Sequence, residues 1–119
     1  MSYKIVIFET DGPTARSQMG LLGNHHQCVE VEGSEISLRD ADLRADDIIV
    51  IDLDEKAPDC FRALDILLRT ARLPKILITA FENDILESRD YFGDCVCQIL
   101  FKPYLPQDFV AAVNELSLA

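Results

Sequence analysis

The strongest constraint on the fold is a run of apolar, β-branched residues from Ile48 to Ile51, with acids on both sides. The run is too short for a helix and is typical of a strand that is buried on both faces of a parallel sheet. Because ligand groups in open α/β sheets gather at the carboxyl ends of the strands, Asp52 is expected to lie in a functional site. This stretch alone leaves a second interpretation open, in which Asp52 and Asp54 form a solvated turn.

Strands and helices are predicted to alternate along the whole chain. Apolar runs predict strands at 3–8, 27–32, 48–51, 75–78 and 96–101. Helical periodicity and capping residues predict helices at about 13–22, 34–45, 60–72 and 83–92, and from about 106 onward. This order calls for an α/β fold with a single doubly wound, five-stranded parallel sheet and helices on both faces, which is the flavodoxin-like arrangement. Residues 1–119 are expected to form one domain.

The charge balance excludes some functions. Eleven Lys and Arg residues against 21 Asp and Glu residues give a net charge of -10. This charge argues against binding of nucleic acid or an anionic membrane and favours a basic partner surface. No apolar run approaches the roughly 20 residues that cross a bilayer, and no targeting signal is visible. The four cysteines lack paired CxxC spacing, which indicates reduced thiols in a cytoplasmic protein, with a Cys95–Cys97 redox or metal pair as the alternative.

Polar residues at the ends of four predicted strands define a candidate site. These residues are Glu9, Asp52, Thr79 and Lys102. Carboxylates that share one sheet edge repel each other unless a cation lies between them, and their hard oxygens suit Mg²⁺. A lysine neutralises a phosphoryl group, and a threonine hydroxyl donates to one of its oxygens. The set therefore points to phosphoryl transfer, in which the protein mainly positions groups and stabilises charge.

Over its whole length the sequence resembles the receiver domain of two-component response regulators, the CheY-like domain. Intervals of 43, 27 and 23 residues separate Glu9, Asp52, Thr79 and Lys102, as is usual in such domains. Four motifs carry the resemblance: Lys4-Ile-Val-Ile-Phe8-Glu9, Ile48-Ile-Val-Ile-Asp52-Leu53, Ile76-Leu-Ile-Thr79-Ala80 and Ile99-Leu-Phe-Lys102-Pro103.

The resemblance implies a phosphoacceptor function. Asp52 would take a phosphoryl group from a histidine kinase or phosphotransfer protein, Lys102 would contact that group, and Thr79 would move toward it. Pro103 would follow a cis peptide. The surface of the fourth helix, fifth strand and fifth helix would then switch and signal to a C-terminal effector domain or a downstream protein. The domain would not be an enzyme, beyond assisting its own phosphorylation and dephosphorylation.

The same resemblance implies a magnesium cofactor. Its ligands would be Glu9, Asp52 and the backbone carbonyl of Asp54, with Asp11 as a further candidate. Three departures from the family pattern bear on this site and on the output. Thr10 stands where the family has a second metal-binding acid, which predicts weakened Mg²⁺ affinity. Residues 54–59 bring Lys56 and a shifted proline beside the acceptor, and Ile99 replaces the family's switch aromatic.

Two alternatives to a working phosphoacceptor remain open. One is a pseudo-receiver, an interaction module that has lost efficient phosphorylation. The other is an unrelated flavodoxin-like protein that binds a nucleotide or flavin, although Gly12 is the single glycine in the loop after the first strand. Tyr91, Phe92 and Tyr104 are the aromatic residues predicted to lie on a partner surface.

Overall fold

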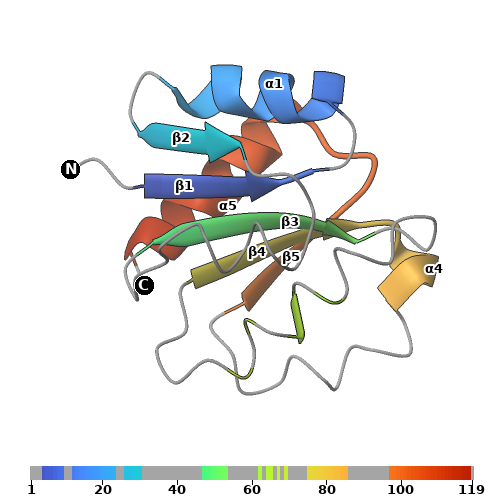
Figure 1. The fold of residues 1–119 in the computed structure, drawn as a ribbon. Helices are drawn as coiled ribbons and strands as arrows, with labels where there is room; N and C mark the ends of the chain where they lie inside the picture. The colour runs from blue at the N-terminus through green and yellow to red at the C-terminus, as the bar shows by residue number, and fades with distance from the viewer. Residues whose placement is uncertain are drawn as a thin grey trace.

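The computed structural model describes residues 4–9, 12–23, 26–30, 47–53, 62, 64–65, 67, 69, 75–85 and 97–118. Within them, five strands form one parallel sheet in the order β2-β1-β3-β4-β5 (Figure 1). The elements are β1 (Lys4–Phe8), α1 (Gly12–Leu22), β2 (Gln27–Glu30), β3 (Ile48–Leu53), β4 (Lys75–Ala80), α4 (Glu82–Ile85), β5 (Cys97–Phe101) and α5 (Pro106–Leu118). The prediction of a five-stranded parallel sheet is therefore confirmed.

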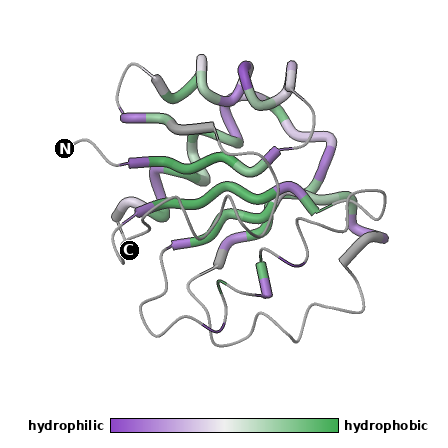
Figure 2. Tube along the Cα trace, in the orientation of Figure 1, coloured by the Kyte–Doolittle hydropathy of each residue, from purple (hydrophilic) through white to green (hydrophobic). Residues whose placement is uncertain are grey.

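Strand β3 lies at the centre of the sheet, between β1 and β4, and all six of its residues are buried. The strand interiors are hydrophobic and their ends are hydrophilic (Figure 2). A continuous apolar run is what a strand covered on both faces requires, because neither face meets water. Because the strands are parallel, the polar residues at their amino ends lie together on one side of the sheet, and those at their carboxyl ends lie together on the other.

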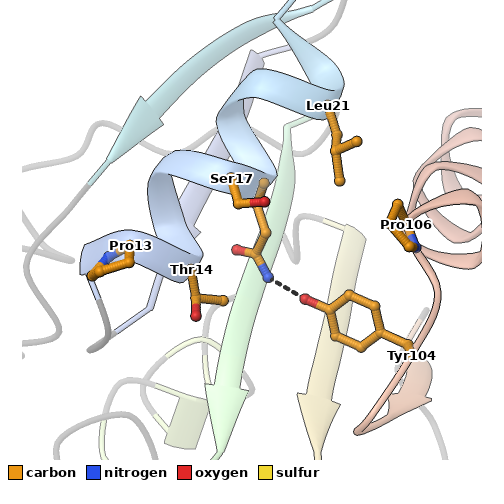
Figure 3. A pocket seen from close by; sticks show the side chains of 7 residues that line it. Pro13, Thr14, Ser17, Leu21, Tyr104 and Pro106 are labelled. Carbon is orange, nitrogen blue, oxygen red and sulfur yellow. Dashed lines mark hydrogen bonds between the residues drawn. The ribbon is translucent and has the colours of Figure 1, made fainter.

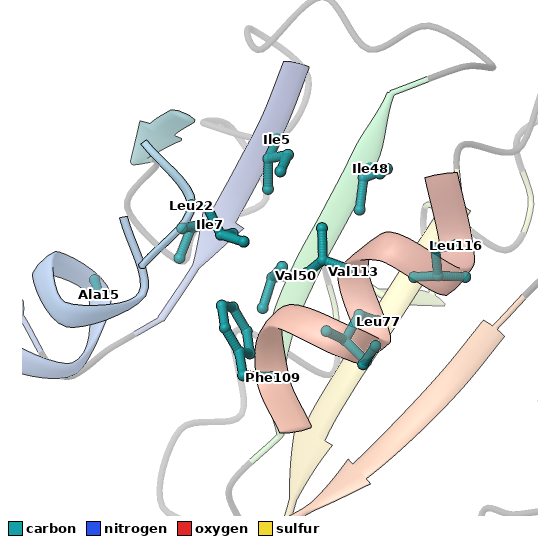
Figure 4. Packing of buried hydrophobic residues seen from close by; sticks show 11 residues of the cluster. Ile5, Ile7, Ala15, Leu22, Ile48, Val50, Leu77, Phe109, Val113 and Leu116 are labelled. Atoms are coloured by element: carbon teal, nitrogen blue, oxygen red, sulfur yellow. The ribbon is translucent and has the colours of Figure 1, made fainter. Parts of the chain in front are cut away.

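Two apolar clusters cover the two faces of the sheet. On one face, α1 and α5 pack over the strands, with Phe109 and Val113 of α5 fully buried (Figure 4). On the other face, Leu64 and Leu67, both in helical backbone, pack against alternate residues of β3 and β4. The side-chain alternation of each strand thus feeds both clusters, and the doubly wound arrangement is confirmed.

Helix α1 follows the predicted pattern at most positions. Ala15 and Leu22 are buried as its periodicity predicts. Gly23 ends the helix by donating its N–H to the carbonyl of Met19 at 2.8 Å. A Cβ at residue 23 would lie 2.9 Å from that same carbonyl oxygen, so the close approach requires glycine. The unexpected residue is Gln18, which is polar and yet buried.

Three predicted boundaries are corrected by the structure. Both β3 and β4 run further than predicted, so that Asp52 and Thr79 lie inside paired strands. Strand pairing extends to Leu53 and Ala80 because the neighbouring backbones continue to exchange hydrogen bonds. Helix α4 begins at Glu82, one residue before the predicted start at 83.

The predicted helix at 34–45, the ends of the helices at 60–72 and 83–92, and Cys95 of the Cys95–Cys97 pair lie outside the described residues. Cys97 is the first residue of β5. Cys28 is a half-buried free thiol, and burial raises its pKa, as expected of a reduced structural cysteine. In the part of the chain that the structure describes, no helix combines the length and the apolar character that a membrane span needs.

Candidate functional site

Strand pairing brings Asp52 and Thr79 together at the carboxyl edge of the sheet. The two residues are direct partners in the β3–β4 register, although they are 27 positions apart in the sequence. The Thr79 hydroxyl donates a hydrogen bond to Asp52 Oδ1 at 3.0 Å. Asp52 is only 3% exposed. The interpretation of Asp52 as part of a solvated turn is therefore wrong, because both its backbone and its side chain are buried and paired.

Lys102 reaches the same carboxylate from the end of β5. Its backbone N–H donates to the carbonyl of Ala80 at 2.8 Å, which continues the β4–β5 pairing past Phe101. The Lys102–Pro103 peptide is cis, as the family resemblance implied. Lys102 Nζ lies 2.7 Å from Asp52 Oδ1, and the lysine side chain is 19% exposed. The predicted grouping of Asp52, Thr79 and Lys102 thus exists, and we name these three residues the acceptor cluster.

Both donors of the acceptor cluster contact the same oxygen of Asp52. Both the ammonium and the hydroxyl contact Oδ1 of Asp52, and Oδ2 takes part in neither contact. Charge-assisted hydrogen bonds of this kind are shorter and stronger than neutral ones. Because a buried carboxylate without a partner is costly, the two donors are what permit a charge at this depth.

Glu9 lies next to the acceptor cluster by strand order. It follows β1 directly, one position past the Phe8–Ile51 pair, and is buried. Its carboxylate and that of Asp52 are hard oxygen donors, which fit Mg²⁺. Thr10, Asp11 and Asp54 lie outside the described residues. Within the described part of the chain, no group of three or more His, Cys, Asp or Glu residues could hold a metal ion.

A pocket of about 340 Å³ lies between α1 and the segment that joins β5 to α5 (Figure 3). Gln18 Nε2 donates to the Tyr104 hydroxyl across it at 2.8 Å, and the Tyr104 ring stacks on Phe109 with 5.7 Å between centroids. Gln18 Oε1 is buried and has no hydrogen-bond partner among the residues that the structure describes. The bond to Tyr104 accounts for the unexpected burial of Gln18. The pocket is lined by Pro13, Thr14, Ser17, Gln18, Leu21, Tyr104 and Pro106.

The Tyr104 hydroxyl responds to the charges of the candidate site. Burial is the main factor that raises its pKa, while the hydrogen bond from Gln18 lowers the pKa. The charges of Glu9 and Asp52 raise the pKa further, and the charge of Lys102 lowers it. All three charged groups therefore act on one hydroxyl, which links the pocket electrostatically to the acceptor cluster.

Sequence reasoning missed two residues beside the candidate site. Phe81 was not singled out, although the parallel register that pairs Ala80 with Phe101 would place residue 81 beside residue 102. Gln18 gave no signal, because a glutamine on an otherwise apolar helix face has no expected partner. Ile99, which replaces the family's switch aromatic, is half-buried and packs against the cluster that contains Leu64. Tyr91 and Phe92 lie outside the described residues.

The sequence matches no protein-family model and no curated protein. The structure, in contrast, is similar to solved receiver domains. A BeF3-activated DrrB receiver domain superimposes with a TM-score of 0.78 at 14% identity, with all of both chains covered. The signal receiver domain of a putative Luxo repressor protein from Vibrio parahaemolyticus gives 0.80 at 13% identity, covering 99% of this chain and 92% of that one.

A third similar structure belongs to a family of redox sensors in the streptococci that evolved from two-component response regulators. It gives a TM-score of 0.78 at 20% identity and covers 98% of this chain. This chain spans about half of that longer protein, 51% of its length. Together the three structures show that the chain has the CheY-like fold of response regulator receiver domains.

Proposed function

We propose that this chain is a receiver domain that accepts a phosphoryl group on Asp52. The acceptor cluster carries the proposal: Lys102 Nζ and the Thr79 hydroxyl both contact Asp52 Oδ1, at 2.7 and 3.0 Å. A carboxylate flanked by an ammonium and a hydroxyl at the carboxyl edge of a parallel sheet is suited to phosphoryl transfer. The protein there supplies position and charge and takes no covalent part beyond the acceptor itself.

In the proposed reaction, a carboxylate oxygen of Asp52 attacks the phosphorus of a phosphohistidine on a kinase or phosphotransfer protein. A P–O bond forms as the P–N bond breaks, and the electron pair of the broken bond returns to the imidazole. Lys102 then shifts from balancing the charge of the carboxylate to balancing that of the phosphoryl group, and Thr79 donates to a phosphoryl oxygen.

A magnesium ion would be held by Glu9 and Asp52, whose oxygens suit it, and Asp11 and the Asp54 carbonyl are further proposed ligands from the sequence. When bound, it would neutralise the charge on the transferring group. The proposed partners are a histidine kinase or phosphotransfer protein and an effector domain or downstream protein. The domain would act as a phosphate acceptor and not as an enzyme on other substrates.

The test is to incubate the protein with acetyl phosphate or phosphoramidate and Mg²⁺ and to measure its intact mass. We expect the gain of one phosphoryl group in the wild type and none in Asp52→Asn. Asp108→Asn is the matched control, because Asp108 is an exposed acid in the first turn of α5, outside the acceptor cluster, and this variant should gain the group normally. A wild-type protein that gains no mass, with no effect of Mg²⁺ on Asp52 resonances, would remove this function.

A second candidate is a pseudo-receiver, a fixed interaction module without efficient phosphorylation. It is favoured by Thr10, which replaces a metal-binding acid of the family pattern, and by the existence of redox sensors with this fold. Thr10→Asp distinguishes the two candidates, because a restored acid should strengthen Mg²⁺ binding at an otherwise intact site. Unchanged Mg²⁺ affinity in that variant would favour the pseudo-receiver.

A further inference from the structure

An exposed aromatic ring stands at the rim of the acceptor cluster. Phe81 directly follows β4 and is 49% exposed. An exposed phenyl ring does not contribute the stabilising free energy that its burial would add to folding. Single exposed apolar residues are common, however, so exposure alone assigns no role to Phe81.

The position of Phe81 follows from the strand register. In the β4–β5 pairing Ala80 is the partner of Phe101, and the N–H of Lys102 donates to the carbonyl of Ala80. Phe81, the residue after Ala80, therefore lies beside Lys102, because Lys102 is bonded to the backbone of Ala80. The fold therefore places the two residues where their side chains can meet.

The ring lies against the lysine ammonium. Lys102 Nζ is 4.7 Å from the centroid of the Phe81 ring, within the range of a cation–π interaction. The same ammonium is 2.7 Å from Asp52 Oδ1. The Phe81 ring and the Asp52 carboxylate thus both contact the same ammonium. Lysine otherwise has a flexible four-carbon stem and many rotamers.

We infer that Phe81 is a positioning residue, which holds the Lys102 ammonium over Asp52 and covers it on one side. The inference rests on the proposed phosphoacceptor function and deepens it. The ring restricts the lysine to the conformations that reach Asp52, so that less freedom is lost when the ammonium binds a phosphoryl group. It also excludes water from one side of the ammonium, which strengthens the attraction between the opposite charges.

The first test observes Lys102 without any phosphorylation. Phe81→Leu keeps apolar bulk but removes the ring face, and Phe81→Tyr keeps the ring. By NMR, the Lys102 side-chain methylene protons should carry an aromatic ring-current shift in the wild type and in Phe81→Tyr and lose it in Phe81→Leu. Leu105→Ala removes another exposed apolar side chain and should leave these signals unchanged. Lys102 signals that do not move in Phe81→Leu would overturn the inference.

The second test measures how long the phosphoryl group stays on Asp52 after acetyl phosphate is removed. A cation–π contact at an exposed site corresponds to about a 2- to 5-fold effect, so Phe81→Leu should lose the group about 2- to 5-fold faster. Phe81→Tyr should restore the wild-type lifetime. Equal lifetimes in all three proteins would overturn the inference while leaving the phosphoacceptor function intact. If the wild type accepts no phosphoryl group, that function fails, and the Lys102 signals alone decide whether Phe81 positions the ammonium.

Discussion

The acceptor cluster and the Gln18–Tyr104 pocket treat buried polar groups in opposite ways. In the acceptor cluster, two donors converge on one oxygen of Asp52. In the pocket, Nε2 of the Gln18 amide is bonded, and the buried Oε1 has no partner in the described part of the chain. A satisfied polar network fixes a single arrangement, whereas a half-satisfied one stores a cost that a rearrangement can relieve. The comparison therefore separates a rigid site from an adaptable one.

The origin of this difference lies in the backbone. Asp52 and Thr79 belong to paired strands, and Lys102 extends a third, so backbone hydrogen bonds set all three positions. Gln18 and Tyr104 belong to a helix and to the segment after β5, and no strand ladder joins them. Their contact is made by side chains alone, through the hydrogen bond between them and the stacking of Tyr104 on Phe109. Four changes test this contrast, and each is expected to have a smaller effect than the one before it.

The first and most damaging change is Phe109→Ala, which removes the support beneath Tyr104. Phe109 is fully buried, so its truncation should lower the free energy of unfolding by about 3–5 kcal/mol in urea titrations. The Gln18–Tyr104 contact should loosen, whereas Asp52 and Lys102 resonances should stay near their wild-type positions. A loss below about 1 kcal/mol would show that the pocket wall does not depend on the core.

Thr79→Val should remove the hydroxyl bond to Asp52 while keeping the side-chain shape. Hydrogen bonds to charged groups contribute about 1.5–3 kcal/mol, so we expect a loss of that size in the free energy of unfolding. Thr79→Ser keeps a hydroxyl and is the control, which should lose less. If the Val variant proves as stable as the wild type, the acceptor cluster is not a satisfied polar network.

The double change Gln18→Leu with Tyr104→Phe removes both bonded partners and the orphaned Oε1 together. Because replacing both partners by apolar groups is close to neutral, thermal and urea unfolding should shift by less than about 1 kcal/mol. A double variant more stable than the wild type would agree with the free-energy cost of burying Gln18 Oε1 without a hydrogen bond. A loss as large as that of Thr79→Val would contradict the contrast between the two regions.

The smallest effect concerns pH. Because the pKa of Tyr104 is raised in the folded protein, its contribution to stability is complete below the ordinary tyrosine value near 10 and declines as pH rises through the folded value. Asp52→Asn removes a charge that raises this pKa, so Tyr104 should ionise at lower pH in that variant. Ultraviolet titration of the phenol, with Tyr104→Phe to identify its signal, checks this. An unmoved midpoint would mean that Asp52 and Tyr104 are not coupled.

The fold was predictable because the buried strands of a doubly wound sheet have continuous apolar sequences. Ile48 to Ile51 identified the central strand, and the rule that sites form at strand ends then selected Asp52, Thr79 and Lys102. The carboxyl ends of β3 and β4 were harder to predict, because Asp52 and Thr79 are polar and yet remain paired inside these strands. The carboxyl edge tolerates such residues where they bond to each other.

The rest of the site depended on contacts that local patterns do not encode. Gln18 and Tyr104 are 86 positions apart, and neither residue type specifies the other. The Phe81–Lys102 contact lies one step beyond a strand pair, so it becomes visible only once the register is known. Local periodicity predicts which residues are buried, whereas the identity of a side chain's partner follows from the tertiary arrangement.

Pairing among β3, β4 and β5 fixes the acceptor cluster, whereas β2 lies at the other edge of the sheet. The β2 edge is therefore available for engineering. Gly23 ends α1, the helix that precedes the edge strand β2, and it is exposed. A peptide tag or a fluorophore-bearing insertion placed after Gly23 would label the domain away from the acceptor cluster. Loop length enters the folding free energy only weakly, so such a sensor should retain the geometry of the wild-type site.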